Sequence, residues 1–359
     1  MQVSSAGKIP VGVLGATGSV GQRFIELLAD HPWFEVTAVT ASERSAGKTY
    51  AEATHWLQAS QLPESVAGLE VLPTGPPLEP KLLFSALDSR AADVAEAELA
   101  RAGHFVVSNA KSHRMDPDVP LMVPEVNPDH LDLVNVQDWG EGAIVTNPNC
   151  STIGLVLALA PLHRAFGLEK VNVVTLQALS GAGIPGVPSM VALDNLVPFI
   201  GGEEDKIENE TSKILGRLDA GAIEPAHVTI SAQVNRVAVI DGHTECVSVA
   251  FRNTPSIEQV REALESFRGE PQERALPSAP TPPIVVLDAP DRPQPRLDRD
   301  RGRGMAVTVG RLRPCPLFDV KFVALSHNTL RGAAGGSILV AELALARGLV
   351  SGVEIPSGN

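Results

Sequence analysis

With 359 residues and a formal net charge of −13, the chain is long enough for two domains with substantial cores. Its acidic balance argues against a nucleic-acid partner or an anionic membrane surface, and no apolar stretch approaches the ~20 residues of a membrane span. The three cysteines fit neither a zinc site nor a disulfide framework, so we predict no metal and a reducing, cytoplasmic setting without a targeting signal.

The first part of the chain alternates strands and helices. Residues 8–32 read as a strand, a glycine turn and an amphipathic helix, and residues 34–42 read as a second strand, which makes a βαβ unit. Further strands are predicted at 81–87, 104–110 and 143–148, with a helix at 91–103. This alternation predicts an open parallel α/β sheet up to about residue 149.

The pattern changes after a helix predicted at 151–165. Strand-like runs then follow closely, at 170–179, 226–240, 244–252, 304–312 and 318–327. Sequential strands with few helices between them predict a second domain of α+β type with a mixed sheet. Proline- and charge-rich segments at 270–283 and 288–304 are interpreted as solvated surface connections. The closing helix, 335–350, could pack on either domain.

The glycine turn is a candidate dinucleotide site. Gly15, Thr17, Gly18, Ser19 and Val20 lie between the first strand and the first helix, where backbone N–H groups meet a pyrophosphate. The GxxGxxG spacing alone also suits a tight turn without a ligand, but its place in the first βαβ unit favours a cofactor.

The end of the second strand bears on which cofactor binds. Ser42 and Arg44 suit the 2′-phosphate of NADP, whereas Glu43 between them suits the ribose hydroxyl of NAD. We predict NADP.

Cys150 stands in the stretch "NPNCST", where a strand ends and a helix begins. The helix N-terminus should lower the thiol pKa below its free value of about 8.5, and backbone donors with the Asn149 amide could stabilise an oxyanion. The alternative is a small buried hydrophobe, but asparagine and proline suit a shaped loop better. We predict a nucleophile.

A thiol nucleophile needs a base, and the chain has nine histidines. His130 and His163 are predicted to lie on the surface. His243 follows an Asp241-Gly242 turn, and Arg236 lies seven residues before it, so both could share a site for a carboxylate-bearing substrate. Taken alone, His243 fits an ordinary turn residue better than a catalytic one.

Seven motifs now carry a resemblance that runs nearly from end to end. In order they are "GATGSVGQRF", "ASERSAGK", "SNAKSHRM", "NPNCST", "LQALSGAG", "RVAVIDGHTE" and "LSHNTLRGAAGGS". They resemble aspartate-β-semialdehyde dehydrogenase of the archaeal and fungal branch. The resemblance implies a Rossmann-type NADP-binding domain, 1–149 with 337–359, and an α+β catalytic and dimerisation domain, 150–336.

The family reaction implied is the reversible, NADP-dependent reductive dephosphorylation of L-β-aspartyl phosphate to L-aspartate β-semialdehyde through a cysteine thioester. It serves the biosynthesis of lysine, threonine, methionine and isoleucine. We therefore expect small-molecule substrates and no nucleic-acid or membrane partner. We also expect the protein to form a homodimer or homotetramer.

The resemblance also assigns roles to residues. The implied catalytic residues are Cys150 as nucleophile, His243 as acid/base and Gln177 as an orienting group. The implied substrate and phosphate residues are Arg236, Glu203, Lys206, Arg114 and Asn149, where Glu203 and Lys206 could otherwise be a surface ion pair and Arg114 a loop charge. The implied cofactor residues are Gly15, Thr17, Gly18, Ser19, Val20, Ser42, Arg44, Ser85, Ala86, Asn328 and Thr329. Cys246 and Cys315 match no catalytic position.

Other functions stay open at this point. A relative could use the same cysteine on another acyl donor, as malonyl-CoA reductase and N-acetyl-glutamyl-phosphate reductase do. A non-catalytic NADP-binding regulator is the alternative from another class, although such a protein could dispense with Cys150, His243 and Arg236, all of which are present.

Overall fold

A computed structural model describes residues 7–356; residues 1–6 and 357–359 of the predicted first domain lie outside the described residues. The described chain divides into two compact units, and each unit is described by itself. The first holds the residues up to Met122, Asp129–Asn147 and those from Ser337, and the second holds Val123–Pro128 and Pro148–Gly336. The functional domain boundaries given above stay a prediction.

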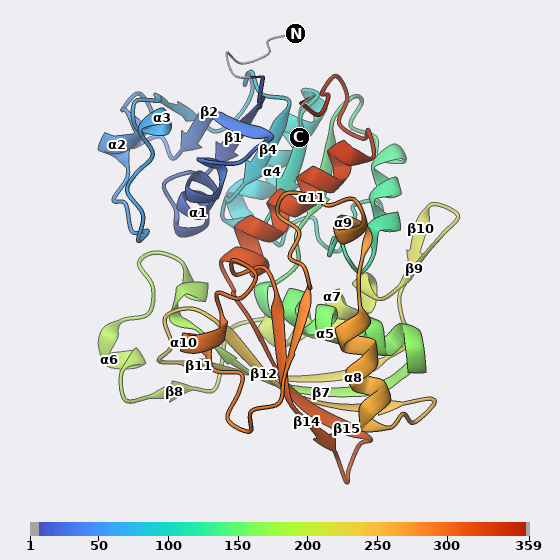
Figure 1. Ribbon diagram of the computed structural model, residues 1–359. Helices are drawn as coiled ribbons and strands as arrows, with labels where there is room; N and C mark the ends of the chain where they lie inside the picture. Colours follow the sequence, from blue (N-terminus) through green and yellow to red (C-terminus); the bar gives the residue numbers. More distant parts are fainter. Residues whose placement is uncertain (1–6, 357–359) are drawn as a thin grey trace. The chain divides into compact units, whose positions relative to one another are not determined.

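The first unit contains a six-stranded parallel sheet in the order β3-β2-β1-β4-β5-β6 (Figure 1). This is the strand order of a Rossmann-type dinucleotide fold. Its strands are β1 (Ile9–Leu14), β2 (Phe34–Ala41), β3 (Val71–Pro73), β4 (Leu82–Ser85), β5 (Phe105–Ser108) and β6 (Ala143–Thr146). Its helices are α1 (Ser19–Leu28), α2 (Tyr50–Ala53), α3 (Glu64–Ala67), α4 (Ser89–Arg101), most of the 3₁₀ helix Pro128–Asn135, and most of α11 (Gly335–Ala346).

Burial explains why the strands of the first unit read as apolar runs. All four residues of β4, β5 and β6 are buried, as expected for a parallel sheet covered on both faces. The last helix is fixed within this unit by a buried contact, because His31 Nε2 lies 2.8 Å from Glu342 Oε1.

The second unit is built on a seven-stranded sheet in the order β13-β14-β15-β12-β7-β11-β8. Strands β7 and β11 are parallel, as are β13 and β14, and the other neighbours are antiparallel. The large strands are β7 (Leu168–Gln177), β11 (Thr229–Val237), β12 (His243–Phe251), β14 (Val307–Pro314) and β15 (Val320–Ser326); β8 (Leu196–Val197) and β13 (Ile284–Leu287) are short, and β9 (Arg217–Asp219) pairs with β10 (Ala222–Glu224). The mixed sheet confirms the predicted fold class.

Helices cover one face of this sheet. Helix α5 (Cys150–Phe166) packs on β7, β12, β14 and β15, with α7 (Glu203–Ile214) and α8 (Ile257–Ser266) beside it (Figure 1). The alternate residues of β12, Cys246 among them, face away from α5, and Cys246 is exposed. The shorter helical turns are Leu179–Ala182, α6 (Ser189–Ala192), α9 (Glu270–Glu273), α10 (Pro295–Asp298) and a π-helical turn, Leu330–Ala334.

The segments interpreted as solvated connections, 270–283 and 288–304, are partly structured, so that interpretation was incomplete. They contain α9 and α10, and Asp298 is 1 % exposed because it accepts hydrogen bonds from Arg292 and Arg301. Charge pairing of this kind is not visible in composition.

The surface placement of two histidines was wrong. His130 is fully buried, and His163 is half-buried because its ring accepts a hydrogen bond from the Leu168 N–H at the start of β7. Burial lowers the pKa of His163.

Between residues 7 and 356, no helix is both long and apolar enough to cross a membrane. Within the same range, no group of three or more His, Cys, Asp or Glu side chains could hold a metal ion.

Candidate active site

Strand register brings the predicted catalytic side chains to one end of the second sheet. Gln177 is the last residue of β7, and Arg236, near the end of β11, is paired with it. His243 is the first residue of β12 and is paired with Ser326, the last residue of β15. Strand pairing therefore places these residues close together in space, although they are far apart in the sequence.

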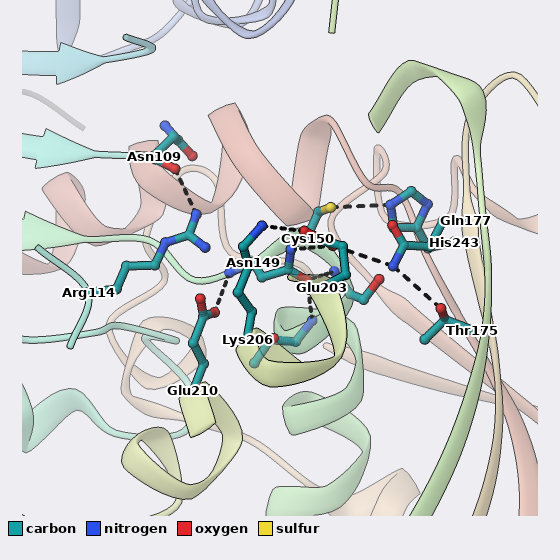
Figure 2. Close-up of polar contacts among 12 residues, drawn as sticks. Asn109, Arg114, Asn149, Cys150, Thr175, Gln177, Glu203, Lys206, Glu210 and His243 are labelled. Carbon is teal, nitrogen blue, oxygen red and sulfur yellow. Dashed lines mark hydrogen bonds and ion pairs between the residues drawn. The ribbon is translucent and has the colours of Figure 1, made fainter. Parts of the chain in front are cut away.

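Cys150 and His243 form the centre of this site. Cys150 is the first residue of α5, and its Sγ lies 3.2 Å from His243 Nε2 (Figure 2). The Ala178 N–H donates to His243 Nδ1 at 3.0 Å, so the proton of the neutral imidazole is on Nε2 and faces the sulfur. Burial, with smaller contributions from Arg236 and His327, lowers the pKa of His243 to about 3. The ring is thus a neutral hydrogen-bond donor to the sulfur.

Arg236 supplies positive charge next to this pair. It is 8 % exposed and donates through Nη1 to the Ala178 carbonyl at 2.6 Å. A Cβ on Gly181 would lie 3.0 Å from Arg236 Nη1 and 3.4 Å from His243 Nε2, so one stretch of backbone touches both side chains. Burial lowers the pKa of Arg236, while negative charge at Cys150 and Glu203 raises it.

Helix α7 contributes a second polar group. Glu203 Oε2 accepts from Asn149 Nδ2 at 2.7 Å and, at 3.5 Å, from Gln177 Nε2, and its Oε1 accepts from Lys206 Nζ at 2.5 Å (Figure 2). The ion pair Glu203–Lys206 is therefore connected to Asn149 and Gln177 and is not an isolated surface pair. Asn149 Oδ1 accepts from the Ser151 and Thr152 N–H groups, which caps α5 and fixes the backbone beside Cys150.

Glu210 belongs to the same arrangement, and sequence reasoning missed it. Its Oε2 accepts the Asn149 N–H at 2.6 Å, and it is 2 % exposed (Figure 2). It follows Glu203 by seven residues, two helical turns, so the helical period of the acidic residues in α7 was the available signal.

The predicted nicotinamide-side residues, Asn328 and Thr329, lie on the loop after β15. Asn328 Oδ1 accepts the Gly242 N–H at 2.8 Å, and its Nδ2 donates to Ser180 Oγ at 2.7 Å. Asn328 therefore ties this loop to the turn that precedes His243. Both residues are buried.

The glycine turn of the first unit fits a dinucleotide. Gly15 has φ +69°, and a Cβ there would lie 2.8 Å from the Ala86 carbonyl oxygen, so only glycine fits between the two segments. Gly18 is the N-cap of α1, and no side chain caps the N–H groups of that helix. Uncapped N–H groups at a helix N-terminus suit a pyrophosphate, with Thr17, Ser19 and Val20 around them.

The other predicted residues of the first unit lie at the same carboxyl edge of its sheet. Ser42 and Arg44 are exposed in the turn after β2, with Glu43 between them. Ser85 ends β4, and Ala86 follows. Arg114, 7 % exposed, donates to the Asn109 carbonyl at 2.7 Å (Figure 2). The Asn109 N–H in turn donates to the Ser85 carbonyl.

The second unit thus brings together Cys150, His243, Gln177, Arg236, Glu203, Lys206, Asn149, Asn328 and Thr329, and the first holds Arg114 and the other cofactor candidates. The roles of these residues stay predictions. Sequence reasoning missed Glu210, Ser180 and Glu245.

Glu245 is a buried carboxyl close to Cys150 and His243. It lies two residues after His243 on the same face of β12, is 1 % exposed, and neither oxygen has a hydrogen-bond partner among the described residues. A Cβ on Gly154, one turn after Cys150, would lie 3.7 Å from Glu245 Oε1. Burial raises the pKa of Glu245 well above 4.5, so the group is held as a neutral acid.

Replacing Glu245 by glutamine should stabilise the protein at neutral pH. Above pH 4.5 the unfolded chain releases this proton and the folded chain keeps it, so the wild type loses about 1.4 kcal/mol of stability per pH unit until the folded pKa is reached. The Tm difference, E245Q minus wild type, should therefore grow from pH 5 to pH 8. The exposed variant Glu262→Gln should show a flat difference; a flat difference for E245Q would mean that Glu245 ionises normally.

Two family models match the chain along most of its length. Residues 10–134 match the NAD-binding domain of semialdehyde dehydrogenase, and residues 159–331 match the semialdehyde dehydrogenase dimerisation domain. Fold and site together therefore define an oxidoreductase of the semialdehyde dehydrogenase class.

Individual relatives narrow this class. The aspartate-semialdehyde dehydrogenase of Methanothermobacter thermautotrophicus is 54% identical, covering 93% of this chain and 98% of its own, and that of Saccharomyces cerevisiae is 50% identical, covering 96% and 100%. The crystal structure of the Candida albicans aspartate-semialdehyde dehydrogenase with NADP superimposes with a TM-score of 0.89 at 48% identity, covering 95% of this chain and 100% of that one. The chain belongs to the aspartate-semialdehyde dehydrogenase family.

Proposed function

We propose that the chain interconverts L-β-aspartyl phosphate and L-aspartate β-semialdehyde, with NADP as cofactor and Cys150 as the covalent nucleophile. One observation carries this proposal. A cysteine at a helix N-terminus lies 3.2 Å from a buried imidazole nitrogen that bears a proton, beside a buried arginine. The relatives described above are named aspartate-semialdehyde dehydrogenase, which supports this reaction.

The positive end of α5 and the Arg236 guanidinium favour a thiolate at Cys150. In the biosynthetic direction the sulfur attacks the acyl phosphate carbon, the C–O bond to phosphate breaks, and a thioester to Cys150 forms. The His243 Nε2–H donates to the oxygen that gains negative charge, a role that a neutral ring performs without prior protonation. Hydride transfer to the thioester carbon would give a hemithioacetal, whose C–S bond then breaks, releasing the aldehyde and returning the electron pair to sulfur.

The polar groups around the pair suit an amino-acid phosphate. Arg236 matches the α-carboxylate, which a guanidinium binds in bidentate fashion. The Glu203 carboxylate matches the α-ammonium, and Lys206 with Arg114 matches the phosphate. Gln177, held beside Glu203 and Thr175, orients the thioester.

The glycine turn, with Gly15, Thr17, Gly18, Ser19 and Val20, would hold the NADP pyrophosphate. Ser42 and Arg44 would contact the 2′-phosphate, Ser85 and Ala86 the adenosine ribose, and Asn328 and Thr329 the nicotinamide side. Bound NADPH supplies the hydride that reduces the thioester.

The dimerisation-domain match supports an oligomeric protein, and we propose a homodimer or homotetramer in the cytoplasm. The exposed face of β12, away from α5, is available to such an interface.

The test is NADP⁺ reduction with L-aspartate semialdehyde, with and without inorganic phosphate. We expect turnover that requires phosphate and that falls sharply when NAD⁺ replaces NADP⁺. Arg44→Ala should raise KM for NADP⁺ by about 10-fold or more and change KM for NAD⁺ little, because it removes a charge-assisted contact that only the 2′-phosphate makes.

No turnover by a folded, NADP-binding protein would overturn the substrate assignment, and malonyl-CoA would then be assayed as acyl donor. Equal use of NAD⁺ and NADP⁺ would instead indicate that Glu43, in the turn after β2, binds the ribose hydroxyl of NAD.

A further inference from the structure

The loop between β15 and α11 touches both members of the catalytic pair. At one end, Asn328 Oδ1 accepts a hydrogen bond from the N–H of Gly242, the residue before His243. At the other end, Gly332 lies against Cys150, and a Cβ on Gly332 would be 2.8 Å from the Cys150 Cβ. The spacing between nucleophile and base therefore depends on where this loop sits.

The loop has an unusual backbone at this point. Leu330–Ala334 forms a π-helical turn, a conformation that is rare and is frequently found at functional sites. Leu330 packs on Gly304, where a Cβ would approach to within 2.4 Å of its side chain. Because a chain seldom adopts π-helical geometry by itself, contacts with surrounding residues must stabilise this turn.

A buried ion pair provides such a contact. Arg331 Nη1 and Nη2 donate to Glu125 Oε1 and Oε2 at 2.8 and 2.6 Å, and both side chains are 0% exposed. A buried ion pair contributes little net stability compared with apolar groups of the same size. Its two parallel hydrogen bonds do fix the orientation of the guanidinium, and with it the position of the turn.

Glu125 is itself firmly anchored. Arg164, in the last turn of α5, donates to the Val126 carbonyl at 2.6 Å. Gly269 packs so closely that a Cβ would lie 2.5 Å from the Glu125 Cα. Helix α5 thus holds the anchor of the ion pair at its C-terminal end and Cys150 at its N-terminal end.

We propose that Arg331 and Glu125 are positioning residues, whose ion pair holds the π-helical turn so that Gly332 supports Cys150 and Asn328 supports the turn before His243. The pair touches neither substrate nor reacting atoms. Its effect on turnover rests on the proposed function, whereas its effect on the thiol does not.

The test removes both charges together, because either single truncation leaves a buried charge that can prevent folding. The double variant Glu125→Gln/Arg331→Met should fold and show a kcat about 10- to 100-fold lower, the range for outer residues that orient a site, with KM changed by less than about 3-fold. Arg331→Lys, which keeps the charge and loses the fork, should give an intermediate kcat.

The reactivity of Cys150 gives a readout that is independent of turnover. Alkylation by iodoacetamide is followed across pH by mass spectrometry of the Cys150 peptide, because Cys246 and Cys315 are also free thiols. In the double variant, the midpoint of the alkylation profile should move to higher pH, because the sulfur is displaced from the His243 Nε2–H.

Two control variants separate positioning from charge and from stability. Arg261→Met/Glu265→Gln removes an exposed Arg–Glu pair on α8, and Val260→Ala weakens the core of the same helix. Both should keep the wild-type kcat and alkylation profile. A double variant at Glu125 and Arg331 with wild-type kcat and profile, or a Val260→Ala variant that shifts them equally, would overturn the proposal. If wild type lacks dehydrogenase activity, the proposed function fails and the alkylation profile alone decides the positioning role.

Discussion

Replacing Cys150 by alanine should lower phosphate-dependent NADP⁺ reduction by about 10⁴-fold or more, because no thioester can form without the sulfur. The variant should still fold and bind NADP⁺, since the cofactor candidates of the first unit do not depend on this side chain. Steady-state assays with fluorescence titration of the cofactor measure the two properties separately.

The same prediction has a direct chemical readout. Wild type mixed with acyl phosphate in the absence of NADPH should carry a covalent acyl group on the peptide that contains Cys150, and Cys150→Ala should carry none. Cys315→Ser, in the β14–β15 connection, is the matched control and should keep both turnover and the adduct. Turnover in Cys150→Ala within 10-fold of wild type would remove the covalent mechanism.

Local signals predicted much of the fold. Apolar runs, the glycine turn and the amphipathic period of α1 were enough to predict the βαβ unit at the start of the chain. Strands of a parallel sheet are buried on both faces and therefore appear in the sequence as apolar runs. The "NPNCST" stretch was also legible, since asparagine before a helix is a cap and Asn149 does cap α5. These features depend on neighbours in sequence.

Non-local features were harder to predict. His243 and Gln177 lie close together only because β12 pairs with β7, and from the residues alone the histidine fitted an ordinary turn residue better than a catalytic one. Resemblance to a family, rather than spacing, singled out both.

Buried charges were the largest gap. Glu125, Glu210, Glu245 and Arg331 are each 2 % exposed or less, yet in a single sequence an acidic or basic residue is most simply a surface residue. Arg331 offered one signal, since it is the single charged residue of the stretch "TLRGAAGGSILVA". A lone charge in such a run requires a partner, although the sequence does not say which.

Replacing His243 by glutamine should lower kcat by about 10²- to 10⁴-fold, the contribution of a positioned proton donor and acceptor. Glutamine can still donate a hydrogen bond from about the place of Nε2, but it cannot exchange a proton. Because the pKa of His243 is lowered to about 3, the ring stays neutral from pH 5 upward in wild type. Wild type and H243Q should therefore show the same shape of kcat/KM between pH 5 and 7.

Phosphate itself titrates in that range, so the comparison with H243Q is what isolates the imidazole. An acid limb near pH 6.5 that is present in wild type and absent from H243Q would contradict the buried, neutral ring. Stability gives an independent check with a defined sign. The unfolded histidine binds a proton below about pH 6.5 and the folded one only near 3, so wild type should lose about 2 kcal/mol between pH 7 and 5 that H243Q keeps. Equal losses in the two proteins would show that His243 is accessible to protons in the folded state, and that a charged imidazolium is the species beside Cys150.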